Sequence, residues 1–296
     1  MDNRDKQWIK QKLDIARAEL GELVFQEVEY ITTGCEKDVL ILDKKTVIAF
    51  FRDGLQFDQY HVRQELIRRL AGQTEAILPE CLYLSPTQHF VVEKYVPGYR
   101  ITPQYVEQHS QYAQQIGRSV GSFLKQLHMK SERRQALPSR FEQDVRNDMN
   151  DGVKLLQAKL SPSEMEQVMH FLCKYYEVSA SVPTCIVHGD FHYDNILWDE
   201  RAGRLGIIDF SEAGMEDPAL DFMYMCYYPR EFRHAVFTEY GSEDATLYER
   251  SQMYDRIYGL YDMIENLQGN PRKPHFEKGY TRFFYRSQDY KLFKLV

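Results

Sequence analysis

The residues best suited to chemistry form one short segment, which reads HGDFHYDNILWD at positions 188–199 and GIIDF at positions 206–210. Two apolar runs in this segment flank the turn-like residues 200–203 (ERAG). Apolar runs of this length around a turn are typical of a β-hairpin. The sequence therefore predicts two antiparallel strands that carry polar residues at their outer ends.

The predicted hairpin brings oxygen-bearing side chains together. If it folds about Ala202, Asn195 falls beside Asp209, since each lies seven residues from that centre. Asp190 lies on the loop just before the first strand. An amide oxygen and a carboxylate can hold a hard cation such as Mg²⁺ against phosphates, while a further carboxylate contacts an incoming hydroxyl. This arrangement predicts phosphoryl transfer.

Each of these residues has a simpler explanation when it is taken alone, because an Asp or Asn beside a strand is usually a turn or capping residue. Turn residues have no reason to pair across a hairpin and to share a loop with His188, so the joint pattern favours a function. A metal-dependent hydrolase is a further alternative, since His188, Asp190, His192 and Asp194 are spaced like metal ligands. The sequence lacks a second His-rich cluster that would complete such a site.

The same segment resembles the aminoglycoside phosphotransferase family, which has a protein-kinase-like fold. The pattern HGDFxxxNILxD followed by GIIDF carries the resemblance, and GMEDPALDF at 214–222 resembles the next block of the family. FVVEKYVPG at 90–98 resembles the family's hinge, and residues 116–128 resemble the helix that follows it. RIYGLY at 256–261 is weakly similar to the branch that phosphorylates aminoglycosides at the 2″ hydroxyl. The resemblance spans roughly residues 20–285.

Four roles follow from chemistry and from the resemblance together. Asp190 is the expected catalytic base, because phosphoryl transfer needs an acceptor hydroxyl that is aimed in line and loses its proton late. Asn195 and Asp209 are expected to hold Mg²⁺ with phosphate oxygens. His188, at the end of a buried strand, is expected to brace the loop. Asp221, at the start of a helical run, is expected to bond backbone amides and steady the same loop.

The resemblance implies ATP or GTP as co-substrate. The backbone of residues 93–96 would meet the purine edge, as the hinge of the family does. Thr32 to Gly34 lie between two strands, where a glycine allows close approach to phosphates, and a plain hairpin turn explains them equally well. The predicted nucleotide-binding residues are Gly34, Arg52, Glu93 and Tyr95.

One departure from the family pattern concerns the phosphate clamp, for which the family uses a Lys or Arg on the third strand and a Glu on the next helix. Alignment puts Ala49 at the basic position and Arg63 at the acidic position. Arg52 and Glu65 are close in sequence but have the wrong strand parity and helix face. The clamp is therefore rebuilt with Arg52 or Arg63, or it is weakened. A nucleotide-binding pseudokinase without transferase activity is the alternative function.

Composition narrows the class of protein. The 296 residues include 44 acidic and 37 basic side chains, for a net charge of −7, which argues against a nucleic-acid-binding protein and suits a cationic small molecule. The five cysteines show no CxxC spacing, which indicates reduced thiols in a cytoplasmic protein. We expect no secretory signal and no membrane helix. The sequence does not predict an oligomeric state.

The periodicity of apolar residues predicts an α+β fold with two lobes. Residues 1–96 combine a leading helix over 5–20, a helix over 58–71 and an antiparallel sheet, and form the expected nucleotide-binding lobe. Pro97-Gly98 breaks the chain. Residues 97–296 form the expected catalytic and substrate-binding lobe, which is mainly helical. Its predicted helices cover 103–130, 141–158, 162–178, 218–228 and 244–267.

The acceptor is the least constrained part of the prediction. Asp255 and Asp262 share one side of the helix predicted over 244–267, and Glu212 follows the metal-binding segment. These carboxylates are candidate ligands for the amino groups of an aminoglycoside-like cation. A solvated acidic helix face is the commoner explanation of Asp255 and Asp262 and is slightly favoured over a binding role. A metabolite with a hydroxyl group is an equal alternative as acceptor, because a fold does not fix its substrate.

Overall fold

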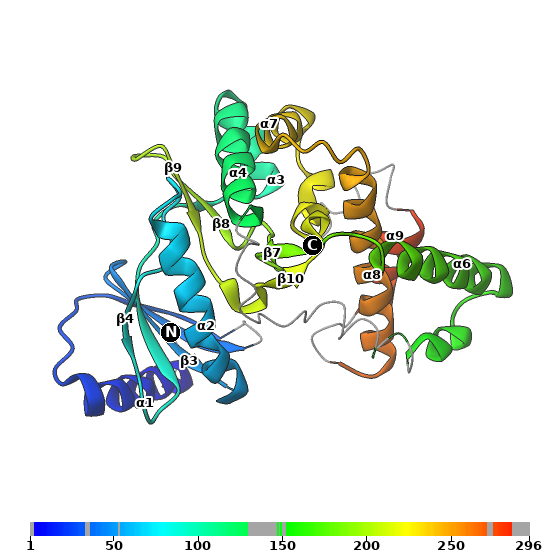
Figure 1. Ribbon diagram of the computed structural model, residues 1–296. Coiled ribbons are helices and arrows are strands. Elements are labelled where there is room, and N and C mark those ends of the chain that lie inside the picture. The colour runs from blue at the N-terminus through cyan, green and yellow to red at the C-terminus, as the bar shows by residue number, and fades with distance from the viewer. Residues whose placement is uncertain are drawn as a thin grey trace. The chain divides into compact units, whose positions relative to one another are not determined.

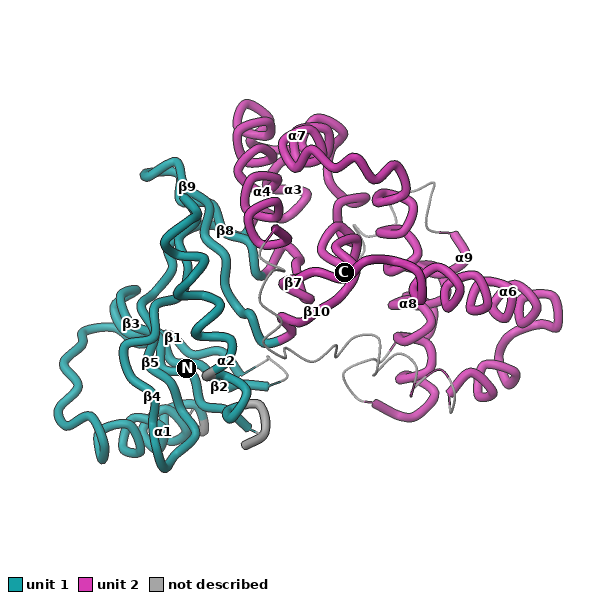
Figure 2. Tube along the Cα trace, viewed as in Figure 1, with its two compact units in different colours: residues 1–100, 195–211 teal, residues 101–194, 212–296 magenta. Residues whose placement is uncertain are grey.

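A computed structural model describes residues 3–32, 36–52, 54–129, 147, 149, 152–270 and 275–285. The chain forms two compact units, which Figure 2 distinguishes by colour. Unit 1 comprises residues 1–100 and 195–211, and unit 2 comprises residues 101–194 and 212–296. The chain thus leaves unit 1 after Arg100 and returns to it for the hairpin segment. The lobe boundary that the sequence predicts between residues 96 and 97 stays a prediction.

Unit 1 is built on an antiparallel sheet of five strands in the order β1-β2-β3-β5-β4. Its strands are β1 (Val28–Ile31), β2 (Lys37–Leu42), β3 (Thr46–Phe51), β4 (Cys81–Leu84) and β5 (Phe90–Lys94), and its helices are α1 (Asn3–Leu20) and α2 (Gly54–Ala71). Side chains alternate between the two faces of a strand, so each strand contributes to two clusters. On β3, Ile48 and Phe50 pack with α1, whereas Ala49 and Phe51 pack with α2. Each helix therefore covers its own face of the sheet.

The predicted hairpin is present in unit 1. It consists of β8 (Ile196–Asp199) and β9 (Arg204–Ile207), and β6 (Tyr99–Arg100) extends it to three strands in the order β6-β8-β9. The predicted register was wrong by one residue, because Ile196 pairs with Ile207. Asn195 therefore lies opposite Ile208, whose N–H donates to the Asn195 carbonyl at 3.0 Å. Asp209 follows one residue further along the chain.

Unit 2 is mainly helical, as the sequence predicts. Its helices are α3 (Pro103–Gln108), α4 (Ala113–His128), α6 (Pro162–Ser179), α7 (Arg230–Tyr240), α8 (Leu247–Leu267) and α9 (Phe276–Phe284). Its 3-10 segments are η1 (Ser110–Tyr112), η2 (Val153–Ala158) and η4 (Pro218–Tyr227), while η3 (Phe210–Glu212) spans the boundary of the units. Two strands, β7 (Cys185–Val187) and β10 (Gly214–Glu216), pair antiparallel. Helix α4 packs along α7, and α8 packs along α9 (Figure 1).

Several predicted elements differ from the observed ones. The helix predicted over 103–130 is divided into α3, η1 and α4, and the segment over 218–228 winds as a 3-10 helix. Helices α7 and α9 and strands β6 and β10 were not predicted, whereas β7 is the buried strand that was expected before His188. Half of the helix predicted over 141–158 lies outside the described residues, and its last six residues form the 3-10 segment η2. In the described part of the chain, no helix combines the length and apolar character needed to cross a membrane.

Candidate active site

Asp221 organises the loop that carries Asp190 in unit 2. The loop begins where β7 ends, and the backbone N–H groups of His188 and Gly189 donate to the Asp221 carboxylate at 2.8 and 2.9 Å. The His128 imidazole lies 3.1 Å from the same carboxylate, and Asp221 is 1% exposed. Gly189 has φ = +83°, a conformation that side chains disfavour. Because its backbone is fixed at two successive amides, the loop leaves the strand in one direction.

His188 fastens the next residue of the loop. Its ring is fully buried and packs edge-on against Phe191 at 5.5 Å. The backbone N–H of Asp190 points to Nδ1 of His188 at 3.4 Å. The imidazole therefore braces the backbone, while the Asp190 side chain, 31% exposed, lies 3.3 Å from Nε2 of His192. This geometry leaves the Asp190 carboxylate accessible to a hydroxyl.

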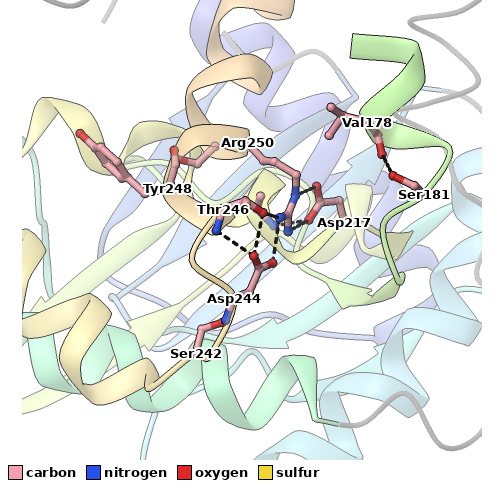
Figure 3. A network of polar contacts seen from close by, with 10 residues as sticks. Val178, Ser181, Asp217, Ser242, Asp244, Thr246, Tyr248 and Arg250 are labelled. Atoms are coloured by element: carbon pink, nitrogen blue, oxygen red, sulfur yellow. Dashed lines mark hydrogen bonds and ion pairs between the residues drawn. The ribbon is translucent and has the colours of Figure 1, made fainter. Parts of the chain in front are cut away.

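A buried ion pair anchors the start of η4, the segment that carries Asp221. Asp217 caps η4 by accepting the N–H of Ala219 at 2.9 Å. Both oxygens of Asp217 accept hydrogen bonds from the Arg250 guanidinium, at 2.7 and 2.9 Å, and Arg250 also donates to Asp244 at 2.7 Å (Figure 3). Helix α8 thus fixes the position from which Asp221 reaches the loop.

In unit 1, Asn195 and Asp209 occupy the open end of the hairpin. Asn195 is 6% exposed, and the Asp209 side chain is 41% exposed. Asp209 has φ = +61°, which is uncommon for a residue other than glycine. Its carboxylate accepts hydrogen bonds from Oγ of Ser211 at 2.8 Å and from Nζ of Lys37 at 2.6 Å. The hairpin therefore brings Asp209 to the first residue of β2.

Lys37 is a site residue that the sequence alone did not indicate. Its side chain is 19% exposed, and it is attracted by Glu93 as well as by Asp209. Glu93 accepts a hydrogen bond from the Tyr60 hydroxyl at 2.7 Å. Burial lowers the pKa of Lys37, but the charge of Asp209 and the hydrogen bond to it together outweigh that effect. The pKa of Lys37 is therefore above its ordinary value. Burial raises the pKa of Glu93, and the Tyr60 hydrogen bond and the Lys37 charge oppose that shift.

The two arginines that the sequence offers for the phosphate clamp do not join Lys37. Arg52 donates to Oδ1 of Asp38, at 3.1 Å from its Nε, and to the Thr32 carbonyl at 2.8 Å. Asp38 lies on the α1 face of the sheet, since it alternates with Lys37 along β2. Arg63 is 4% exposed on α2 and donates to Gln59, in its own helix, at 3.1 Å.

Gly34 and Tyr95 are the remaining residues that were predicted to bind the nucleotide. Gly34 lies outside the described residues. The N–H of Tyr95 donates to the Lys45 carbonyl at 2.9 Å, so this amide continues the pairing of β5 with β3 beyond the end of the strands.

The two carboxylates of α8 that were predicted to bind a cationic acceptor are buried and face an arginine. Asp255 is fully buried and accepts hydrogen bonds from Nε of Arg282 at 2.8 Å and from the Tyr227 hydroxyl at 2.7 Å. Asp262 is 6% exposed and lies 3.6 Å from Nη1 of the same Arg282. The solvated acidic face was therefore a wrong prediction, because α9 packs on α8 and supplies a buried counter-charge.

Two tyrosines lie close enough to Asp190 for its charge to act on them. Burial, above all, raises the pKa of Tyr224 to about 12, and the negative charge of Asp190 acts in the same direction. Burial raises the pKa of Tyr258, and the negative charges of Asp190 and Glu212 act in the same direction. The His192 ring lies 5.6 Å from that of Tyr224. The surroundings of Asp190 in unit 2 are therefore aromatic as much as acidic.

The hydrolase alternative finds no support in the geometry. Among the residues that the structure describes, no three His, Cys, Asp or Glu side chains form a group that could hold a metal ion. His192 instead lies between Asp190 and Asp194, at 3.3 and 3.6 Å. Within the described ranges, Cys81, Cys173, Cys185 and Cys226 form no disulfide.

Solved structures with a kinase-like fold share this arrangement of an antiparallel sheet followed by a mainly helical region. The streptomycin–ATP complex of APH(2″)-IIa is 21% identical, with a TM-score of 0.70 and coverage of 93% of this chain and 95% of that one. The GDP and kanamycin complex of APH(2″)-IIIa is 18% identical, with a TM-score of 0.78 and coverage of 93% and 98%. A choline/ethanolamine kinase family protein from Mesorhizobium loti is 18% identical, with a TM-score of 0.70 and coverage of 94% and 95%. The fold predicted from the sequence is thereby confirmed.

A family model settles the class of enzyme. The model of the phosphotransferase enzyme family, APH, matches residues 34–258. The chain belongs to this family, and it is therefore a small-molecule phosphotransferase. The resemblance predicted from the segment around residues 188–222 is confirmed.

Proposed function

We propose that this enzyme transfers the γ-phosphate of ATP or GTP to a hydroxyl group of a small molecule, with Asp190 as the catalytic base. The observation that carries the proposal is the braced loop, in which Asp221 and His188 fix the backbone around Asp190 while its carboxylate stays accessible. Phosphoryl transfer asks mainly for such positioning, because the protein does little covalent chemistry. The acceptor hydroxyl donates its proton to the Asp190 carboxylate as the bond to phosphorus forms.

Asn195 and Asp209 fit a magnesium ion. Both offer hard oxygen ligands at the open end of one hairpin, and Mg²⁺ in such sites takes one or two protein oxygens and completes its shell with phosphates and water. Bound there, the ion would neutralise charge on the nucleotide phosphates. The uncommon backbone conformation of Asp209 supports a functional role, since strained positions cluster at active sites.

The nucleotide and the acceptor are argued from similarity and chemistry. The similar proteins include complexes with ATP, with GDP, and with the aminoglycosides streptomycin and kanamycin, which makes an aminoglycoside the first acceptor to test. A choline/ethanolamine kinase family protein is similar to the same degree, so smaller amino alcohols are tested beside it. Arg282 neutralises Asp255 and Asp262, so an acceptor cation would rely on other groups, such as Glu212 or the tyrosine rings near Asp190.

The test is a transfer assay with purified protein, Mg²⁺, and ATP or GTP against a panel of aminoglycosides, macrolides and amino alcohols. We expect Asp190→Asn to lower kcat by about 10²- to 10⁴-fold while the urea midpoint is retained. Asp199→Asn is the matched control, because Asp199 ends β8 and its side chain accepts two backbone N–H groups of the hairpin turn. Equal turnover by wild type and Asp190→Asn would refute the role of Asp190.

A further inference from the structure

Unit 1 places a positively charged side chain, Lys37, beside Asp209. The strand position at which the family pattern has a Lys or Arg is occupied by the uncharged Ala49. In the register of the sheet, Val39 of β2 pairs with Ala49 of β3, and Lys37 lies two residues before Val39. Residues two apart on a strand share a face, so Lys37 projects from the same face as Ala49. Ala49 carries only a methyl group there. The positive charge missing from β3 is therefore present on the neighbouring strand.

The position of Lys37 suits a phosphate ligand. Its Nζ lies 2.6 Å from Oδ1 of Asp209, the residue proposed to hold the magnesium ion. It also lies 5.4 Å from the centroid of the Phe51 ring, which is opposite Lys37 in the register. These contacts restrict the long side chain to one direction, so less rotamer entropy remains to be lost when a phosphate binds.

A counter-charge for Lys37 comes from β5. Glu93 pairs with Val47 of β3, which shares its face with Ala49, so Glu93 stands on the Lys37 face as well. Glu93 is attracted by Lys37 and accepts the Tyr60 hydroxyl of α2 at 2.7 Å. In the family pattern the helix supplies the acid itself. Here α2 supplies Tyr60, which holds an acid that belongs to the sheet.

We propose that Lys37 is the phosphate-binding cation of this enzyme and that Glu93, held by Tyr60, positions it, so that the pair replaces the family's lysine on the third strand and glutamate on the following helix. The inference rests on the proposed function in that it requires a nucleotide in this site. It explains how Ala49 and Arg63 stand at positions where the family uses a base and an acid without loss of the clamp. It also removes the main reason to regard the chain as a pseudokinase.

Binding of nucleotide and nucleoside, measured by calorimetry with Mg²⁺, tests the assignment. ATP, adenosine, GTP and guanosine are each titrated into wild-type protein. The triphosphate that binds more tightly, and its nucleoside, are used for the variants. We expect Lys37→Met to weaken triphosphate binding about 10- to 100-fold, the contribution of a charge-assisted hydrogen bond, and to leave nucleoside binding unchanged. Lys44→Met is the matched control, because Lys44 is exposed and pairs with Glu29 in a surface turn. Glu93→Gln is expected to lower triphosphate binding less than Lys37→Met does.

The outcomes separate this inference from the proposed function. If wild type binds triphosphate and Lys37→Met binds it equally well, the assignment of Lys37 is overturned while the proposed function stands. An equal loss of triphosphate and nucleoside binding would assign Lys37 a structural role only and overturn the inference too. If wild type binds neither nucleotide, the proposed function itself fails. Lys37→Gln serves as the second variant should Lys37→Met fail to fold, with the same expected ratio.

Discussion

Replacement of Asp221 by Asn should destabilise unit 2 strongly, although the two side chains have nearly the same shape. The carboxylate uses both oxygens, since Oδ2 accepts the N–H of His188 and Oδ1 accepts the N–H of Gly189. His128 also lies against Oδ2, at 3.1 Å. An amide has one acceptor oxygen, so in either orientation its NH₂ group faces one of the two backbone N–H groups. One buried donor is then left without an acceptor.

The magnitude follows from these contacts. A hydrogen bond to a buried charge contributes about 1.5–3 kcal/mol, and an unsatisfied buried donor costs about 1–3 kcal/mol. Because Asp221 is 1% exposed, water cannot replace the lost partner. We therefore expect the free energy of unfolding to fall by about 3–5 kcal/mol in Asp221→Asn.

Urea unfolding followed by circular dichroism measures this loss. Asp199→Asn is the control, because Asp199 also accepts two backbone N–H groups, from Arg201 and Ala202, but at the surface of a turn. Both bonds go to one oxygen, Oδ1, which an Asn retains, so we expect a loss of no more than about 0.5–1 kcal/mol. If Asp221→Asn costs no more than Asp199→Asn, then removing one of two buried acceptor oxygens carries no penalty and the account of the loop is wrong.

Three further substitutions test the packing of the site. Arg250→Met should lower the free energy of unfolding by about 3–5 kcal/mol, because it leaves Asp217, 4% exposed, as a buried charge; urea titration would disprove this with a loss below 1 kcal/mol. Gly189→Ala should cost about 2–3 kcal/mol more than Gly21→Ala in the same titration. Both glycines have positive φ, but a Cβ at 189 would lie 2.2 Å from the Glu212 carbonyl oxygen, whereas nothing lies within 4 Å at 21. Leu124→Ala, in the fully buried face of α4, should lower the thermal midpoint and cost about 2–5 kcal/mol, and an unchanged midpoint would contradict the packing described for α4.

The hairpin could be predicted from sequence because its signal is local, but its register could not. Four residues join the strands, so the centre falls between Arg201 and Ala202 and not on Ala202. Asp199 accepts the N–H groups of both central residues, and Gly203 has φ = +61°. This turn chemistry, and not the apolar pattern, sets which residues face each other.

Lys37 was missed because periodicity within one strand does not give the register between strands. The spacing of two residues that puts Lys37 and Val39 on one face of β2 was present in the sequence, but it becomes informative only when Val39 is known to pair with Ala49. The family pattern has a base on the third strand, and Arg52 is the base nearest to that position in the sequence. Parity already argued against Arg52, and the structure shows it bonded to Asp38 on the face covered by α1.

The acids on α8 show how far net charge can mislead about a substrate. A chain with a net charge of −7 suggests a cationic ligand only if its carboxylates reach solvent at the site. Gly259 and Gly279 let α8 and α9 approach so closely that a Cβ on Gly279 would lie 2.6 Å from the Gly259 carbonyl oxygen. That approach brings Arg282 to Asp255 and Asp262, and two negative charges are answered by one buried positive charge. The local charge available to an acceptor is therefore smaller than the composition suggests, and an acceptor panel restricted to polycations would be chosen on the wrong physical ground.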